Sequence, residues 1–297
     1  MPESPELRIQ MDLLKGFIGK TIIGMNHNEK SKFNKHKIKG LHLIKLPVKL
    51  NNIFCRGKTI IFEGLTRQNK TIYMVSQLGM TGKWYWSKEG KLKPAKHSDF
   101  WIDFGRPSKS FKGKWVLQYR LYFNDMRHFG NFNIYDKDTI DEVWKKHGPC
   151  LLTTALYNKG IDKKLNNQQK IITKEKYIEK LSDKRLKNKQ ICGFMLEQKY
   201  FSGIGNYLRA EILYSSKIRP DKLLSQLSND EKENLYKYSL DVILRAYLTQ
   251  GPPNGYIPEG SFTLNCYNRE YDPYGNPVVR QRFKDNRTMH WVPKIQK

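Results

Sequence analysis

The sequence has little of what a membrane or secreted protein requires. No apolar run approaches the roughly 18 to 20 residues of a membrane-spanning helix. Acidic residues at Glu3 and Glu6 replace the basic and then apolar start of a signal peptide. The four cysteines are too few and too far apart for a disulfide framework or a Cys-x-x-Cys pair; they are Cys55, Cys150, Cys192 and Cys266. We therefore expect an intracellular protein, without a membrane partner, whose thiols are buried and reduced.

Acidic residues are also scarce relative to basic ones. Lys and Arg number 54 against 28 Asp and Glu, so the 297 residues carry a net charge of +26. The resulting pI of about 9.8 exceeds the value of about 9 that is typical of nucleic-acid-binding domains. An anionic membrane would attract such a chain too, but the charge is spread along the sequence rather than gathered on one amphipathic stretch. Nucleic acid is the expected partner, bound by a monomer.

Changes in periodicity predict an α+β fold. Apolar residues at helical spacing over 5–18 indicate an N-terminal helix, and residues 21–136 contain strand-like runs separated by glycines. Beyond Gly148 the period becomes helical, and we expect helices at about 189–200, 206–215 and 229–249, as well as an exposed helix within 161–190. Alternation over 278–283 and 287–291 predicts a two-stranded hairpin.

These patterns divide the chain into three expected domains. Residues 1–140 should form the N-terminal helix and a β-sandwich, residues 148–261 a helical domain, and residues 262–297 the C-terminal β-hairpin.

The N-terminus, Met1-Pro2-Glu3-Ser4-Pro5-Glu6, could carry a nucleophile. Removal of Met1 would expose the secondary amine of Pro2, whose ordinary pKa is near 8. Attack by this amine on a sugar C1′ gives an iminium, which accepts the electrons of a subsequent elimination. A neighbouring carboxylate could carry the protons. The simpler alternative is that Pro2 precedes a helix and the acids interact favourably with its dipole.

A second candidate site lies between two of the predicted helices, at Gly203-Ile204-Gly205-Asn206. Free backbone N–H groups at a helix start bind phosphate, and Asn206 could cap the helix while donating to the same anion. The alternative is an ordinary helix hairpin.

Together these segments resemble the Fpg/Nei family of formamidopyrimidine-DNA glycosylases and endonuclease VIII, over nearly the whole chain. The start is similar to the family's Pro-Glu-Gly-Pro-Glu, with Ser4 in place of Gly. Residues 203–211 resemble its helix-two-turn-helix element, especially that of eukaryotic and viral endonuclease VIII-like members. The resemblance implies that Pro2 is the Schiff-base nucleophile and Glu3 the acid and base. It also implies that Lys58 assists catalysis from a β-hairpin.

Further matches concern the extrusion of the damaged base. Leu78-Gly79-Met80-Thr81-Gly82 resembles the family's Leu-Gly-Met-Ser-Gly, and residues 125–130 resemble Asp-Pro-Arg-Arg-Phe-Gly. Met80, Arg127 and Phe129 would then fill the gap left by the extruded base. Without the resemblance, Met80 and Phe129 would be assigned to the core. Glu6 is expected to contact the lesion, and Asn206 the DNA.

Phosphate contacts are less well supported at two positions of the same segments. Gln77 and His128 stand where bacterial members have His and Arg.

The C-terminal segment departs from bacterial members, which end in a four-cysteine zinc finger. The four ligand positions are occupied here by Val278, Gln281, Val292 and Ile295, so no thiolate remains for zinc. We expect a zincless finger that is held by apolar contacts among Val278, Val292, Ile295 and Trp291, with neither metal nor cofactor. The resemblance implies that Arg287 both binds the phosphates of the lesion and contributes to catalysis; otherwise it is one surface base among many.

The combined prediction is a bifunctional DNA glycosylase and AP lyase of base-excision repair. It would remove oxidised pyrimidines and ring-opened purines from duplex or single-stranded DNA through a Pro2 Schiff base and β,δ-elimination. One alternative is an 8-oxoguanine-preferring formamidopyrimidine-DNA glycosylase, and another is a non-catalytic nucleic-acid-binding protein. Residues 251–262, which would cover the flipped base, carry no readable code for the lesion.

Overall fold

The computed structural model describes residues 2–29, 31, 33, 38–89, 91, 96–250 and 260–297. Met1, with its predicted removal, and residues 251–259 of the predicted lesion-covering loop lie outside this part of the chain. Two compact units are present. The first contains Pro2 and Leu7–Trp144, and the second contains Glu3–Glu6 and Lys145–Lys297. The predicted hairpin region 262–297 thus falls in the second unit, and the predicted domain boundaries remain predictions.

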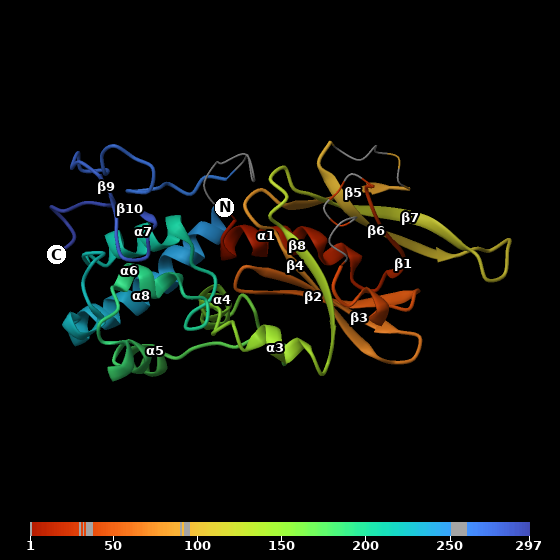
Figure 1. Cartoon of the computed structure of the whole chain (residues 1–297), viewed down its shortest axis with the longest axis horizontal. Helices are drawn as coiled ribbons and strands as arrows, with labels where there is room; N and C mark the ends of the chain where they lie inside the picture. The colour runs from red at the N-terminus through yellow and green to blue at the C-terminus, as the bar shows by residue number, and fades with distance from the viewer. Residues whose placement is uncertain are drawn as a thin grey trace. The chain divides into compact units, whose positions relative to one another are not determined.

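The first unit is built on an eight-stranded antiparallel sheet, which Figure 1 shows together with helix α1 (Ser4–Leu14). The sheet order is β5-β7-β6-β1-β2-β3-β4-β8. Its strands are β1 (Thr21–His27), β2 (Val48–Arg56), β3 (Thr59–Thr66), β4 (Thr71–Gln77), β5 (Lys83–Lys88), β6 (Ser98–Pro107), β7 (Trp115–Asn124) and β8 (Asn131–Asp136). The expected helix over 5–18 ends earlier, because residues Lys15–Phe17 form a 3-10 turn. Helix α3 (Ile140–Trp144) closes the unit.

The sheet folds over itself into a sandwich. Trp84 in β5, at one end of the strand order, packs its ring against Phe62 of β3 at 5.4 Å and Phe132 of β8 at 5.9 Å. Its indole Nε1 donates to Ser76 Oγ of β4 at 3.1 Å. Because these partners lie on strands from the other half of the sheet, the inner face encloses an aromatic core. The predicted α+β class with a β-sandwich is confirmed.

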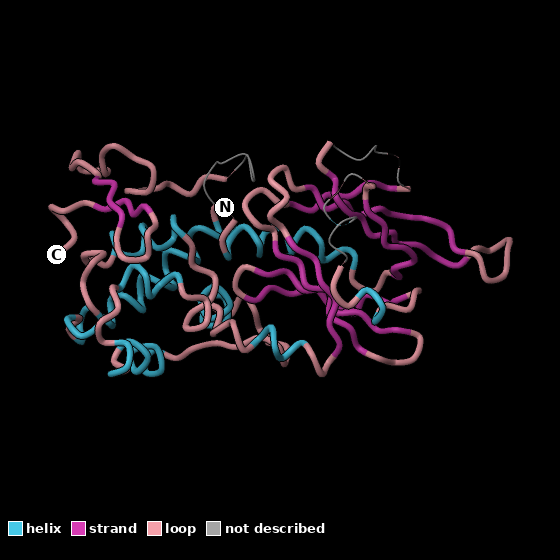
Figure 2. Tube along the Cα trace, in the orientation of Figure 1, coloured by secondary structure: helices cyan, strands magenta, loops and turns pink. Residues whose placement is uncertain are grey.

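The second unit is mainly helical. Its elements are α4 (Leu151–Asn158), α5 (Lys174–Leu181), α6 (Ile191–Leu196), α7 (Asn206–Ser215), α8 (Asn229–Leu248), β9 (Val279–Arg282) and β10 (Thr288–Trp291), with 3-10 turns at Lys184–Leu186 and Leu224–Gln226. The predicted helices at 206–215 and 229–249 and the hairpin are confirmed. Figure 2 shows that strands are otherwise confined to the first unit among the described residues.

Helix α6 is shorter than the predicted 189–200. Glu197 at its end has an extended backbone, and the Gln198 side chain donates to the carbonyls of Leu196 and Ile204 at 3.0 Å each. These bonds replace helical ones and hold residues 197–205 as a loop. The predicted exposed helix within 161–190 is α5, whose N-cap Thr173 accepts from Lys176 N. No described helix is long and apolar enough to cross a membrane.

Candidate functional site

The N-terminus of helix α7 in the second unit is occupied by the carboxylate of Glu3. Glu3 Oε2 accepts from the backbone N–H of Gly205 and of Leu208, the latter at 3.3 Å, and Oε1 accepts from Tyr207 N at 3.0 Å. A carboxylate is stabilised here by the otherwise unpaired amides and the helix dipole. Glu3 is only 2% exposed. It is therefore fixed in one orientation as a residue of the second unit.

Glu6 completes a pair of buried carboxylates. Its Oε2 accepts from Glu3 N at 2.8 Å, and its Oε1 accepts from the hydroxyl of Tyr207 at 2.8 Å. Burial raises the pKa of Glu6 to about 7, and the nearby charge of Glu3 acts in the same direction. Burial likewise raises the pKa of Tyr207. Glu6 can therefore exchange a proton near neutral pH.

The structure corrects the predicted capping role of Asn206. The N-cap of α7 is Gly205, with no side-chain cap, and Asn206 is the first helical residue. Its Oδ1 is buried and has no hydrogen-bond partner among the described residues. The amides that were expected to bind phosphate are already bonded to Glu3, because a carboxylate from the N-terminus competes for the same donors.

Pro2 and Lys58 lie in the first unit. Pro2 is buried and directly precedes Glu3 in the chain. Lys58 is half-buried in the two-residue turn between β2 and β3, where Arg56 pairs with Thr59. Gly57 has a φ of 58° in this turn, a conformation that favours glycine. Lys58 therefore occupies a hairpin tip, the location that the resemblance implies.

Two turns of the first unit carry the side chains predicted to fill the gap, and they are joined by a buried aspartate. Asp125 is fully buried; its Oδ1 accepts from Thr81 Oγ1 at 2.6 Å and its Oδ2 from Gly130 N at 2.6 Å. A Cβ atom at Gly79 would lie only 2.6 Å from Gly130 N, so the turns pack backbone to backbone. No role was expected for Asp125 from the sequence, although this residue begins the motif at residues 125–130.

The side chains on these turns are exposed. Met80 is 36% and Phe129 is 56% exposed. Neither belongs to the core, so the assignment to the core that their residue types alone suggest is wrong. The guanidinium of Arg127 lies over the Phe129 ring, 4.9 Å from its centroid. His128 Nδ1 lies 2.8 Å from Oδ2 of buried Asp99. The apolar surface and the Arg127 cation thus face outward together.

The C-terminal hairpin is held by packing at positions 278, 281, 292 and 295, which align with the zinc ligands of the bacterial zinc finger. Val292 is fully buried and Trp291 is 8% exposed in the core of the second unit, against which Val278 and Ile295 also pack. Gln281 at the remaining position accepts from the Trp291 indole at 3.3 Å. No described group of His, Cys, Asp and Glu could hold a metal ion. The four positions supply no zinc ligand and do not fit the metal.

Charged anchors that the sequence analysis missed lie on helix α7. Glu211 is fully buried, and its carboxylate accepts from the backbone N–H of Asn265, Cys266 and Tyr267 at 2.8 to 3.0 Å. Arg209 is also fully buried and forms an ion pair with Asp285 in the β9–β10 turn. Their signal was two charges within an otherwise apolar helix, which must be paired when buried.

Arg209 and Asp285 connect helix α7 to the predicted phosphate contact. Arg209 also donates to the carbonyls of Cys192 and Thr288 at 3.3 Å each. Asp285 Oδ1 accepts from the backbone N–H of Arg287 at 3.1 Å. Arg287 itself is exposed. The buried pair therefore fixes the backbone from which the Arg287 side chain extends.

Two family models match this chain. The formamidopyrimidine-DNA glycosylase N-terminal domain matches residues 1–132, and the formamidopyrimidine-DNA glycosylase H2TH domain matches residues 165–252. The chain belongs to the Fpg/Nei family. The first match covers most of the first unit, and the second match lies within the second unit.

Relatives within the Fpg/Nei family are distant in sequence. The formamidopyrimidine-DNA glycosylase of Mycoplasma genitalium is 27% identical over 84% of this chain and 77% of its own length. That of Rickettsia africae is 27% identical over 91% and 89%. Endonuclease 8 of Pectobacterium atrosepticum is 27% identical over 42% of this chain. The aligned segment is about half of that relative's length.

Solved structures share the fold over the full chain. The Lactococcus lactis Fpg complex with DNA containing Fapy-dG has a TM-score of 0.76 and 21% identity, with 99% of each chain covered. The complex of the same enzyme with DNA containing an oxidised pyrimidine also has a TM-score of 0.76 and 21% identity, with 100% of each chain covered. At this identity the likeness establishes the fold.

Proposed function

We propose that this chain is a bifunctional DNA glycosylase and AP lyase that removes oxidised pyrimidines and ring-opened purines. The observation that carries the proposal is the buried pair Glu3 and Glu6 directly after Pro2, with Glu3 held by three amides of helix α7. A carboxylate fixed next to an amine nucleophile in the chain suits proton transfer during covalent catalysis. Membership of the Fpg/Nei family and relatives solved with damaged DNA support it.

The chemistry uses the amine of Pro2 after removal of Met1. The electron pair of the amine forms a bond to C1′ while the N-glycosidic bond breaks, and the base leaves with the electron pair of the broken bond and gains a proton. The amine loses its own proton as the sugar ring opens and O4′ gains one, which leaves an iminium between Pro2 and C1′. Glu3 exchanges these protons. Glu6, whose pKa is about 7, accepts a hydrogen bond from the backbone N–H of Glu3. It can also return a proton to the Glu3 carboxylate.

The iminium then drives strand cleavage. Because it withdraws electrons from C2′, loss of a C2′ proton expels the phosphate on C3′. A second elimination, through loss of the C4′ proton, expels the phosphate on C5′, and hydrolysis of the imine by water releases the enzyme. Both phosphates remain on the ends of the gap.

The remaining predicted residues serve binding in this proposal. Arg287, Lys58 and Asn206 contact phosphates near the lesion, and Lys58 also supplies a proton for base loss. Arg287 contributes to catalysis because its phosphate contact holds the sugar in place for attack by Pro2. A contact from Glu6 to the lesion uses lone pairs beyond the two already bonded to Glu3 N and the Tyr207 hydroxyl.

Met80, Arg127 and Phe129 occupy the space of the extruded base. Their exposure and the shared Asp125 anchor of their turns support this assignment.

One observation favours a second candidate, an 8-oxoguanine-preferring formamidopyrimidine-DNA glycosylase. Relatives named formamidopyrimidine-DNA glycosylase align over 84% and 91% of the chain, whereas endonuclease 8 of Pectobacterium atrosepticum aligns over 42%. Single-turnover rates on duplexes that contain either 5-hydroxyuracil or 8-oxoguanine distinguish the two. Faster excision of 8-oxoguanine would support the second candidate.

Borohydride reduction tests the covalent mechanism. The protein with a free Pro2 amine should form a reducible adduct with a duplex containing one oxidised pyrimidine. A variant that retains residues before Pro2 should form none, because its nitrogen is an amide. The control is binding of this variant to a duplex with a tetrahydrofuran abasic analogue, which should persist. Full lyase activity in the blocked variant would exclude Pro2 as the nucleophile, and absence of any adduct would favour a non-catalytic DNA-binding protein.

A further inference from the structure

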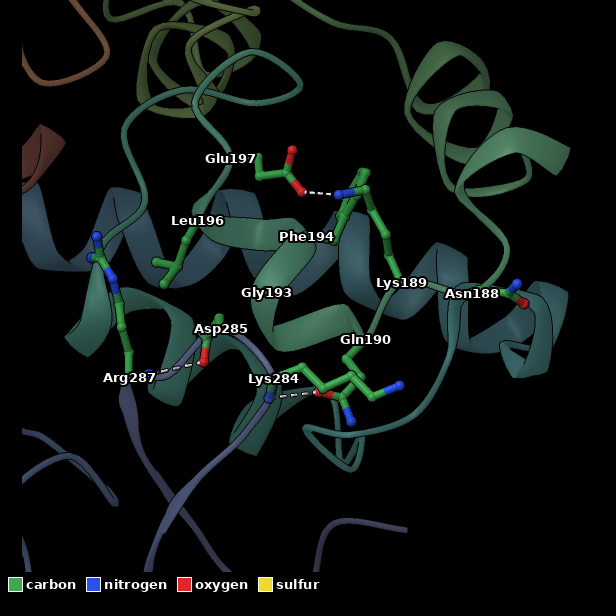
Figure 3. A pocket seen from close by; sticks show the side chains of 10 residues that line it. All are labelled: Asn188, Lys189, Gln190, Gly193, Phe194, Leu196, Glu197, Lys284, Asp285 and Arg287. Carbon is green, nitrogen blue, oxygen red and sulfur yellow. Dashed lines mark hydrogen bonds and ion pairs between the residues drawn. The ribbon is translucent and has the colours of Figure 1, made fainter.

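A pocket of about 410 Å³ lies between helix α6 and the β9–β10 turn, entirely within the second unit. Figure 3 shows its lining residues, which come from 188–197 on the helix side and from Lys284, Asp285 and Arg287 on the turn. Its volume lies within the range of small-ligand sites, roughly 300 to 1,000 Å³. The pocket can therefore hold a chemical group of the size of a nucleotide's sugar and phosphate.

The charges of this pocket favour an anion. Its two acids are already paired: Asp285 with buried Arg209, and Glu197 with Lys189 and Lys199. Lys284 and Arg287 differ, because their backbone N–H groups are bonded, to Gln190 Oε1 and Asp285 Oδ1, while their side chains form no ion pair with any described residue. The pocket thus has two cations whose charges are not neutralised locally.

The shape of the lining indicates what accompanies the anion. Phe194 and Leu196 give the pocket an apolar wall, and Gly193 adds no side chain to it. Figure 3 shows the Arg287 side chain extending toward Leu196, while Lys284 lies beside Gln190 on the other side of Asp285. A fully hydrated ion gains no favourable contact from the apolar wall, whereas a deoxyribose attached to a phosphate can pack against it.

We propose that this pocket is a second phosphate subsite for the DNA strand, in which Lys284 binds a phosphodiester different from the one that Arg287 binds. The intervening deoxyribose packs against Leu196 and Phe194. The inference rests on the proposed function, because it assumes that Arg287 contacts lesion DNA. It extends the contact with the strand beyond the phosphates at the lesion.

The first measurement is the salt dependence of binding to a duplex with a tetrahydrofuran abasic analogue. Lys284→Ala should reduce the magnitude of the slope of log K against log salt by about 0.9, the value for one phosphate contact. Between 50 and 200 mM salt the variant should accordingly lose about 3.5-fold less affinity than the unaltered protein. Lys294→Ala, an exposed lysine of the same unit outside the pocket, is the matched control and should keep the original slope.

The second measurement identifies the phosphate. Single methylphosphonates, which remove one charge at a time, are placed along the lesion strand. A position that weakens binding to the unaltered protein should have no further effect on Lys284→Ala, and Arg287→Ala should become insensitive at a different position. The same position for both variants would overturn a separate second subsite. Inorganic phosphate supplies the remaining comparison, because a pocket for free phosphate would show competition at constant ionic strength with no methylphosphonate position singled out.

A second variant and the melting temperature distinguish a loss of phosphate binding from a folding defect. Lys284→Gln provides a second variant, and both should melt at the original temperature because the Lys284 side chain forms no ion pair with any described residue. An unchanged salt slope in both would overturn the proposal. If no borohydride adduct forms but the slope still changes, the proposed catalysis fails while the subsite stands; the reverse result preserves catalysis alone.

Discussion

The ion pair between Arg209 and Asp285 gives a demanding test of how the hairpin is held without a metal. Asp285→Ala would leave the guanidinium of Arg209, which is fully buried, with the carbonyls of Cys192 and Thr288 as its only partners among the described residues. An uncompensated buried charge of this kind costs about 3 to 5 kcal/mol. In a domain of 150 to 250 residues each kcal/mol shifts the melting temperature by roughly 2 to 4 °C. The expected loss is therefore about 6 to 20 °C.

Scanning calorimetry at neutral pH measures this change. The matched control is the pair between Arg245 and Asp241 on helix α8, whose side chains are 50% and 52% exposed. Asp241→Ala should leave the melting temperature nearly unchanged, since exposed pairs contribute little. Equal melting temperatures for Asp285→Ala and this control would refute the reasoning.

A double variant separates stability from positioning. Arg209→Met combined with Asp285→Leu should recover most of the lost stability, because apolar replacement of both partners is often neutral or stabilising. The backbone N–H of Arg287 would still lack its acceptor, so binding to lesion duplex should stay weaker than in the unaltered protein. Full recovery of binding would show that the pair only supports folding.

Three further predictions concern Glu6, the metal and the exposed turns. The pKa of Glu6 is about 7 in the folded state against an ordinary 4.5, so its contribution to stability is complete below pH 4.5 and is lost as the pH rises through 7. Glu6→Gln should remove roughly 3 kcal/mol of this pH dependence, measured as melting temperature against pH, and an identical profile would contradict it. Elemental analysis should find no stoichiometric zinc, and chelators should leave activity unchanged, because positions 278, 281, 292 and 295 lack ligands; one equivalent of zinc would show the opposite. Met80→Ala or Phe129→Ala should lower base excision from duplex DNA far more than cleavage at a preformed abasic site, because extrusion costs a few kcal/mol. Equal losses would indicate a role in folding.

Local pattern alone determined much of the fold. Helical periodicity located α7 and α8, and alternation located the β9–β10 hairpin, because periods of 3.6 and 2 residues are properties of short segments. The same local information showed that Val278, Gln281, Val292 and Ile295 cannot bind zinc. It also placed Pro2 beside Glu3. It failed for α6, where the Gln198 side chain competes with the helical hydrogen bonds.

Only the tertiary structure decided which groups are partners. Glu3 accepts hydrogen bonds from backbone amides more than 200 residues away. The start of α7, where we expected a phosphate to bind, is therefore capped by a carboxylate. The partner of Arg209 was likewise not visible in the sequence, and the exposure of Met80 and Phe129 followed from the resemblance but not from the local pattern. The physical reason is that burial and ion pairing depend on which distant segments meet, whereas periodicity records only which face of a segment is apolar.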